Sequence, residues 1–306
     1  MRVTLIHNPG AGVPGGGEIA RLLAVLRDAG HSVRYQSSKD DGWDRVLDEA
    51  AELVAVAGGD GTVARVAKRM LDRSTPVAPL PAGTANNIAR TLGLAGLPVE
   101  DIVRGWREPR SVKLDIGKAT GPWGTRRFVE AVGLGLFACA VPRADASRTI
   151  RSLERADAKV AYALQLLKDD LEACTPVAIE ATLDGADVSG EFVMFEAMIL
   201  PYVGPNLHLA PDTRPGDGQM EVVMVRDAER DRLHEILASW QNEKPRVAVL
   251  PSRRGRRLSF AWTGYPMHID DRIWPAPGED FPAPPGRIEL SIEGAVDFLV
   301  PQAKPK

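Results

Sequence analysis

The sequence has few of the patterns that mark metal-binding and membrane-spanning proteins. It contains only two cysteines, Cys139 and Cys174, and neither has the spacing of a metal or redox motif. Its five histidines are scattered and form no HxxxH pair. No run approaches the roughly 18 apolar residues of a transmembrane helix. These absences argue against a structural zinc site and a transmembrane segment, and reduced cysteines fit a cytoplasmic protein.

The sequence also lacks an excess of charge of one sign. It has 38 basic and 41 acidic residues, a net charge of -3, and no basic stretch interleaved with aromatics. We therefore expect no nucleic acid partner. Residues 1–6 lead directly into a strand-like run, which leaves no room for a signal peptide. The length of 306 residues and the 44% of apolar residues fit a globular protein of two domains.

Two glycine-rich motifs are the most informative features that are present. GGDGT spans residues 58–62 and GTANN spans residues 83–87, and each follows a short apolar run typical of a buried parallel strand. Glycines permit positive φ and leave no Cβ in the way, so backbone N–H groups can close around an anion. We expect a helix over 62–71 and another from Thr84 to Leu92, with their N-termini toward that anion. The pair predicts a site for nucleotide phosphates.

The two glycine motifs also have other interpretations. An ordinary strand, turn and helix with glycine in the turn explains either motif alone. A P-loop is excluded because the stretch 10–17 has no lysine at the required position. A dinucleotide fingerprint fits weakly, because the motif follows the third strand-like run and the next strand ends without an acidic residue.

The motifs and their order resemble the diacylglycerol kinase catalytic family, which includes bacterial lipid kinases and the sphingosine and ceramide kinases. The resemblance covers most of the chain and rests on residues 7–12, 58–62, 80–90, 113–117 and 210–218. NAD kinases share the GGDGT motif, so an NAD kinase remains an alternative, although GTANNIAR has the lipid-kinase form. The resemblance implies a nucleotide-binding domain followed by a lipid-substrate domain, with ATP and Mg²⁺ as cofactors.

The family's nucleotide loops map onto particular residues of this sequence. The resemblance assigns ATP binding to Asn8, Gly58, Gly59, Asp60, Gly61, Thr62, Gly83, Thr84 and Asn86, with Ser38 as a further hydroxyl contact. Asp60 could hold Mg-ATP through water or cap its own helix, and both readings stay open. Where the family often has Asn-Glu after GGDGT, this sequence has Ala64 and Arg65, so support from that glutamate is missing.

The acceptor side departs further from the family. An Asp-Gly-Glu motif implicated in deprotonating the lipid hydroxyl corresponds here to Asp270, Asp271 and Arg272. Either Asp270 or Asp271 is the base while Arg272 stabilises the γ-phosphate, or the protein has lost most of its kinase activity; a surface salt bridge is a third reading. The family's structural magnesium site points to Asp217 as a metal ligand, whereas an Asp-Gly turn explains the same residues without metal.

Hydrophobic patterns predict two domains. Residues 1–118 alternate strands and helices, as in an α/β domain with a parallel sheet, with strands over 2–7, 32–36, 53–57 and 77–80. Residues 119–306 carry longer strand-like runs, among them 177–183 and 246–250, as in an antiparallel β-sandwich. One amphipathic helix is expected to interrupt them over 147–173. The pattern does not decide whether 294–301 return to the first domain. The basic residues 253–257 are either a contact for anionic headgroups or a solvated hairpin tip.

The resemblance implies an ATP- and magnesium-dependent lipid kinase that phosphorylates a hydroxyl of diacylglycerol or a related lipid. Since no transmembrane segment is expected, the enzyme would meet its lipid substrate from the water side, as a cytoplasmic protein peripheral to the membrane. A homodimer is compatible with the sequence, which has no heptad pattern to decide the oligomeric state. The alternatives are a homologue that binds nucleotide or lipid without catalysis, and an NAD kinase.

Overall fold

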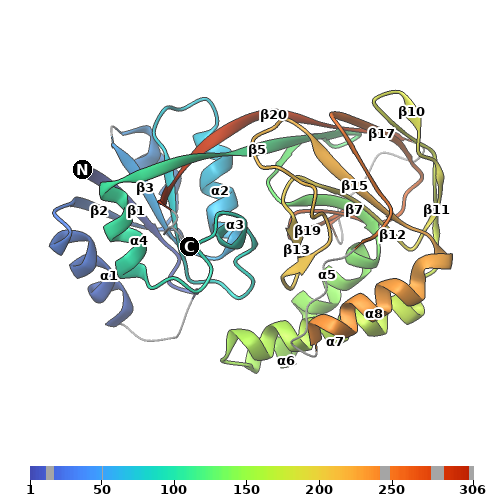
Figure 1. Ribbon diagram of the computed structural model, residues 1–306, viewed down its shortest axis with the longest axis horizontal. Helices are drawn as coiled ribbons and strands as arrows, with labels where there is room; N and C mark the ends of the chain where they lie inside the picture. Colours follow the sequence, from blue (N-terminus) through green and yellow to red (C-terminus); the bar gives the residue numbers. More distant parts are fainter. Residues whose placement is uncertain (12–16, 50, 242–248, 277–285, 303–306) are drawn as a thin grey trace. The chain divides into compact units, whose positions relative to one another are not determined.

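The computed structural model describes residues 1–11, 17–49, 51–241, 249–276 and 286–302. The chain divides into two compact units, one of Met1–Leu114 with Gly294–Lys306 and one of Asp115–Glu293 (Figure 1). Two long strands, β5 (Pro109–Gly121) and β20 (Gly286–Pro301), contribute residues to both units. The C-terminal residues thus belong to the first unit, a point that the sequence pattern left undecided.

The first unit is built on a parallel sheet. Its strands lie in the order β20, β4, β3, β1, β2, where β1 is Arg2–His7, β2 is Ser32–Ser37, β3 is Leu53–Gly58 and β4 is Val77–Pro81. All residues of the central β3 are buried, as expected for a parallel strand covered on both faces. The α/β expectation and its four strands are confirmed, with each strand end within one residue of the prediction.

Helices connect these strands (Figure 1). They are α1 (Gly17–Asp28), η1 (Trp43–Asp48), α2 (Asp60–Met70), α3 (Asn87–Thr91), α4 (Val99–Arg104) and η2 (Gly105–Arg107). Helix α2 buries Val63, Val66, Ala67 and Met70, the apolar face that its spacing predicts.

One helix boundary in this unit was predicted wrongly. The helix expected to begin at Thr84 begins at Asn87, because Asn86 adopts a left-handed conformation with φ of 55°. A residue in that conformation cannot continue a right-handed helix. The second motif therefore forms mostly a loop, and the helix α3 that follows it has only 5 residues.

The C-terminal end of β20 completes the first unit's sheet. Phe298 pairs with Val77 of β4 in parallel and is fully buried. Its neighbour Asp297 alternates to the other side of the strand and accepts a hydrogen bond from Ser111 Oγ at 2.9 Å. The sheet's fifth strand thus comes from the far end of the chain.

The second unit contains two packed antiparallel sheets, which confirms the predicted sandwich. One has the order β16, β15, β12, β7, β18, β19, and the other includes β10, β9, β17 and β20 with the hairpin of β5 and β6. Their inner faces share one apolar core that includes Phe128, Phe195, Phe260 and Trp262. The first sheet's strands are β16 (Ser252–Gly255), β15 (Met220–Val225), β12 (Met194–Met198), β7 (Ala131–Gly135), β18 (Met267–Ile269) and β19 (Arg272–Trp274).

Most of the remaining strands of this unit are short. They are β6 (Gly124–Phe128), β8 (Val177–Ile179), β9 (Ala181–Leu183), β10 (Ala186–Asp187), β11 (Gly190–Phe192), β13 (Tyr202–Val203), β14 (Leu207–His208) and β17 (Arg257–Trp262). The run expected as one strand over 177–183 becomes β8 and β9, whose partners differ: β8 pairs with β11 and β9 with β17. The strand expected over 246–250 falls largely outside the described residues.

Helices cover the outer face of the six-stranded sheet. The single helix expected over 147–173 is wrong, because the segment contains α6 (Arg148–Ser152) and α7 (Ala156–Ala173), preceded by α5 (Leu136–Ala146). Ser147 is extended and its hydroxyl accepts the N–H of Ile150 at 3.2 Å, so it caps α6 instead of continuing a helix.

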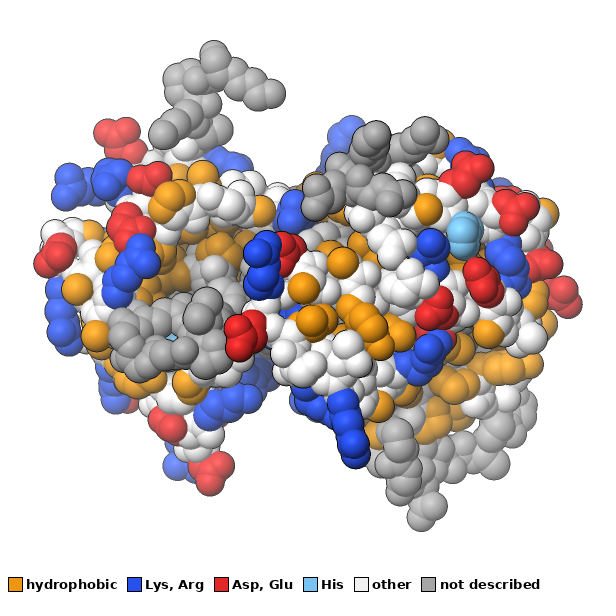
Figure 2. Space-filling model, turned by 90° about the horizontal axis from the view of Figure 1, so that it is seen from below, with side chains coloured by type: hydrophobic (Ala, Val, Ile, Leu, Met, Phe, Trp, Pro, Cys, Tyr) orange, Lys and Arg blue, Asp and Glu red, His pale blue; other side chains and the backbone are white. Residues whose placement is uncertain are grey.

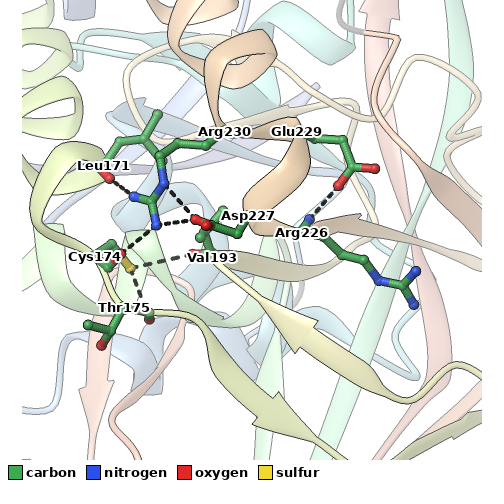
Figure 3. Close-up of polar contacts among 8 residues, drawn as sticks. All are labelled: Leu171, Cys174, Thr175, Val193, Arg226, Asp227, Glu229 and Arg230. Carbon is green, nitrogen blue, oxygen red and sulfur yellow. Dashed lines mark hydrogen bonds and ion pairs between the residues drawn. The ribbon is translucent and has the colours of Figure 1, made fainter.

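The C-terminus of α7 is capped from the neighbouring helix α8 (Arg230–Gln241), which follows η3 (Asp227–Glu229). Helix α7 has no basic residue in its last turn. The Arg230 guanidinium instead donates to the carbonyls of Leu171 and Cys174 and pairs with Asp227 (Figure 3). A cation at these carbonyls complements the helix dipole and holds α7 and α8 together.

The basic residues 253–257 are not a hairpin tip. Arg253 and Arg254 lie in β16, which pairs with β15, and the chain then crosses to β17 in the other sheet. The carboxylate of Asp184 accepts the N–H groups of Arg256 and Arg257 at this crossing. The cluster is therefore part of the sandwich framework.

We expect Phe298→Ala to destabilise the first unit. Removing a fully buried phenyl ring leaves a cavity and typically costs about 3–5 kcal/mol. Urea unfolding followed by tryptophan fluorescence measures the change, and Asp297→Asn on the other side of the strand serves as the control. Equal unfolding midpoints for wild type and Phe298→Ala would show that the C-terminal strand contributes nothing to this unit.

Candidate functional site

The two glycine motifs of the first unit meet at their glycines. A Cβ added to Gly83 would lie 2.4 Å from the Cα of Gly59, and one added to Gly59 would lie 3.0 Å from the Cα of Gly83. Real Cβ contacts are not that short, so any larger residue would push the loops apart. The backbones of the two motifs can approach this closely only because both residues are glycine.

Asp60 links the two motifs. It lies in the first turn of α2, and its Oδ1 accepts the N–H of Ile88 in α3 at 2.9 Å. Burial raises the pKa of the Asp60 carboxyl, and the N–H groups of Ile88, Asn87 and Asn86 act against that increase. The expected alternatives were a water-mediated Mg-ATP contact and a cap on its own helix. The printed sequence did not suggest that Asp60 binds the start of the next helix.

Side-chain amides hold the loops in shape. Asn86 forms a reciprocal pair with Gly83: its Oδ1 accepts the Gly83 N–H at 2.9 Å and its Nδ2 donates to the Gly83 carbonyl at 2.8 Å. Asn8 donates to Thr62 Oγ1 at 3.2 Å and accepts the N–H of Gly10 at 3.1 Å. Three segments far apart in sequence are thereby joined around the N-terminus of α2.

The other expected nucleotide residues lie in the same loops. Gly58 is buried beneath Thr62, where an added Cβ would come within 2.8 Å of the threonine Cβ. Gly61 and Thr84 are exposed. Ser38 follows β2, donates its N–H to the His7 carbonyl at 2.7 Å, and is buried, and its hydroxyl has no hydrogen-bond partner among the described residues.

This constellation fits the phosphates of a nucleotide. The N-terminus of the 11-residue helix α2 offers N–H groups with a positive dipole end. The glycines beside it leave the backbone uncovered, and Ser38 supplies a buried hydroxyl in need of a partner. Sequence reasoning brought these residues together correctly but not the amide pair or the Asp60 link.

The second unit holds the acceptor-side candidates. Asp270 and Asp271 form the two-residue loop between β18 and β19, since Ile269 pairs with Arg272. The Asp270 carboxylate accepts the N–H of Glu130 at 2.8 Å and that of Val129 at 3.0 Å. It therefore ties the loop to the segment before β7.

Asp271 and Arg272 differ from Asp270 in being exposed. Within the described part of the chain, neither side chain forms an ion pair, so the expected surface salt bridge is not seen there. One carboxylate and one guanidinium are thus available beside each other at the tip of the hairpin.

Sequence reasoning missed a buried acid and base beneath this hairpin. Glu196 in β12 and His268 in β18 are both fully buried, and His268 Nε2 lies 2.8 Å from Glu196 Oε2. His268 Nδ1 lies 2.9 Å from the Asp270 carbonyl oxygen. The signal in the sequence is a glutamate within the otherwise apolar run MFEAM.

The expected metal ligand Asp217 already has partners. Its Oδ2 forms an ion pair with Arg254, and its Oδ1 accepts the N–H of Gln219 at 3.0 Å. The neighbouring Asp115 accepts N–H groups from Gly216 and Gly218. The arginine at Oδ2 would compete with a cation for this carboxylate. Among the described residues, no group of three or more acidic, His or Cys residues has metal-site geometry.

Two surface properties bear on the expected partners. No described helix is long and apolar enough to cross a membrane. On the face drawn in Figure 2, Lys and Arg side chains are scattered among Asp and Glu side chains.

Two family models match most of the chain. Residues 2–119 match the family model of the diacylglycerol kinase catalytic domain, and residues 133–289 match that of the YegS C-terminal NAD kinase beta sandwich-like domain. A diacylglycerol kinase of Bacillus subtilis is 27% identical over 74% of each chain, and one of Mycobacterium tuberculosis is 22% identical over 91% of each. A probable YegS-like lipid kinase of Klebsiella pneumoniae is 30% identical over 41% of this chain and 47% of its own.

A solved structure shares the fold. That of a putative diacylglycerol kinase from Bacillus anthracis covers 94% of both chains with a TM-score of 0.69 and 21% identity. The first domain model covers both glycine motifs, and the second covers residues 270–272. The chain therefore belongs to the diacylglycerol kinase and YegS-like family of lipid kinases.

Proposed function

We propose that this protein transfers the γ-phosphate of ATP to a hydroxyl of diacylglycerol or a related lipid. The observation that carries the proposal is the approach of Gly59 to Gly83, which leaves bare backbone beside the N-terminus of α2. Phosphoryl transfer passes through a loose transition state, so alignment of the phosphates and neutralisation of their charge supply most of the catalysis. The protein would bind its lipid substrate at the membrane surface.

The nucleotide residues divide into two groups by what they do. Gly59, Gly61 and Gly83 would keep the backbone open to the phosphates, and Gly58 leaves room for Thr62. Asn8, Asn86 and Thr62 fix the loop shapes through the hydrogen bonds described above. Ser38 and Thr84 would offer hydroxyls to the nucleotide. Magnesium bound to ATP would neutralise phosphate charge, with Asp60 as the carboxylate nearest to the α2 N-terminus.

On the acceptor side, Asp271 is a better candidate for the base than Asp270. The Asp270 carboxylate is engaged with two backbone N–H groups and would lose them on accepting a proton. Asp271 is exposed and can accept a hydroxyl proton, while the adjacent Arg272 can pair with a phosphoryl oxygen.

The non-catalytic alternative rests on two departures from the family pattern, at Arg272 and at Ala64 with Arg65. The guanidinium of Arg65 lies 5.3 Å from the centre of the Trp43 ring, a cation–π contact. Its side chain is thus occupied locally and does not replace the missing glutamate. Catalysis would then depend on Asp271 and Arg272.

The proposed reaction is tested with purified protein, magnesium and labelled ATP against diacylglycerol, sphingosine, undecaprenol, phosphatidylglycerol and NAD. We expect label in a lipid. Asp271→Asn should lower kcat by about 10²–10⁴-fold with an unchanged unfolding midpoint, because it removes a general base. Asp270→Asn is the matched variant, and it should lower the unfolding midpoint, because one side-chain acceptor becomes a donor facing backbone N–H groups. Label in NAD alone would establish an NAD kinase, and ATP binding without any labelled product would favour the non-catalytic homologue.

Two substitutions distinguish the role of the Asp60 charge from that of its hydrogen bond to Ile88. Asp60→Asn keeps an oxygen for the Ile88 N–H but loses the charge, so it should bind ATP normally without magnesium and gain little affinity when magnesium is added. Asp60→Ala also loses the link between the motifs, so metal-free ATP affinity should fall about tenfold, which is about 1.4 kcal/mol. Calorimetric titration with and without magnesium measures both effects. If magnesium raises the ATP affinity of Asp60→Asn as much as that of the wild type, the Asp60 charge is not needed for Mg-ATP binding.

The ion pair of Asp217 and Arg254 predicts that this loop needs no divalent cation. EDTA should leave the thermal unfolding midpoint of the nucleotide-free protein unchanged. A magnesium site filled at about 100 times its Kd would instead add about 2.7 kcal/mol, and chelation would remove that stabilisation. A midpoint that falls with EDTA and returns with magnesium would restore Asp217 as a metal ligand.

A further inference from the structure

We propose that the buried pair of Glu196 and His268 positions Asp271 and Arg272 by holding the backbone of Asp270. This inference rests on the proposed function in assigning catalysis to Asp271, but its geometry is independent of that assignment. Glu196 and His268 act through Asp270 and are positioning residues.

The pair occupies a space that the sheet opens for it. Strands β12 and β18 flank β7, and both Glu196 and His268 are in register with Gly133 of β7. A Cβ on Gly133 would lie 2.1 Å from Glu196 Oε2. Glu196 and His268 thus meet over the missing side chain, on the sheet face that also carries Met194 and Met198 toward the helices.

The hydrogen bonds of His268 fix where its protons lie. A carbonyl oxygen only accepts, so the Nδ1 that faces the Asp270 carbonyl carries a proton. The bond between Nε2 and Glu196 Oε2 then holds one shared proton, and the pair is neutral overall. Burial alone would lower the pKa of His268, but the Glu196 charge and both hydrogen bonds outweigh it and raise that pKa.

Every polar group of Asp270 is engaged. Its N–H donates to the Ala131 carbonyl at 2.8 Å, its carbonyl accepts from His268, and its carboxylate accepts the N–H groups of Val129 and Glu130. Its φ is 52°, in the left-handed region that is strained for most residues other than glycine. Such a conformation persists only where surrounding contacts over-determine it, and it fixes the direction in which Asp271 leaves the strand.

Core filling alone does not account for this pair. Glu196 Oε1 has no hydrogen-bond partner among the described residues, so the glutamate bears an uncompensated desolvation cost. Apolar residues of similar volume often fill such a space at no loss of stability. The one bond that apolar residues could not supply is the donor from His268 to the Asp270 carbonyl.

Two matched double variants test the inference without leaving a buried charge. In Glu196→Gln/His268→Asn, the asparagine amide can stand where Nδ1 stood and donate to the Asp270 carbonyl. In Glu196→Gln/His268→Gln, the amide reaches the Nε2 position and the donor to Asp270 is lost. We expect kcat for lipid phosphorylation to fall about tenfold or more in the second relative to the first, with equal KM for ATP, because small displacements of a reacting group cost large factors.

Amide hydrogen exchange at Val129, Glu130 and Asp270 provides a readout that needs no activity. Faster exchange in the glutamine double variant than in the asparagine one is expected, and equal exchange together with equal kcat would overturn the inference. If the wild type labels no lipid while the exchange difference is present, the proposed function fails and the positioning of the turn stands.

The wild-type protein gives a test that does not depend on the folding of variants. Nitrogen-15 spectra of the five histidines should show one ring, that of His268, with Nδ1 protonated across roughly pH 5 to 9. An unprotonated His268 Nδ1 would exclude the bond to the Asp270 carbonyl and with it the inference.

Discussion

The nucleotide site depends on the contact between two backbones that no side chain separates. Gly59 and Gly83 approach so closely that a single methyl group on either would have to displace the other loop. This approach brings the turn of the second motif beside the N-terminus of α2, where Asp60 can bind Ile88 and Asn86 can close on Gly83. Each of these hydrogen bonds contributes modestly, between about 0.5 and 3 kcal/mol. Together they fix a geometry that is possible only because Gly59 and Gly83 have no side chains.

In the second unit, a glycine without a side chain makes room for other side chains and not for backbone. At Gly133 the space above the sheet is not closed by backbone but filled by Glu196 and His268 from the two neighbouring strands. A glycine in a central strand weakens the strand itself, so its presence there needs a packing reason. The buried pair supplies one, and the hydrogen bond from His268 carries its effect to the hairpin loop at Asp270.

How far the sequence predicts this structure depends on the range of the interactions. The strands of the first unit were predicted to within one residue because β3 and its neighbours are short, apolar and buried on both faces. The helix over 147–173 was predicted wrongly because Leu153 and Arg155 adopt extended backbone between α6 and α7, although the apolar spacing continues across them. The pair of Glu196 and His268 could not be predicted, since it depends on the register of three strands from distant parts of the chain.

The departure from the family motif at residues 270–272 can now be interpreted from the contacts. The Asp270 carboxylate accepts the N–H groups of Val129 and Glu130. Its charge therefore stabilises the turn, and in the proposed mechanism it does not take the proton. The next position in the family motif is glycine, which has no side chain to offer, whereas Asp271 presents an exposed carboxylate there. In the proposed mechanism, replacement of the motif's glutamate by Arg272 removes one acid, and Asp271 would supply another. Loss of the glutamate would then not by itself abolish the reaction, because the proposed carboxylate lies one residue earlier on a turn whose backbone accepts a hydrogen bond from His268.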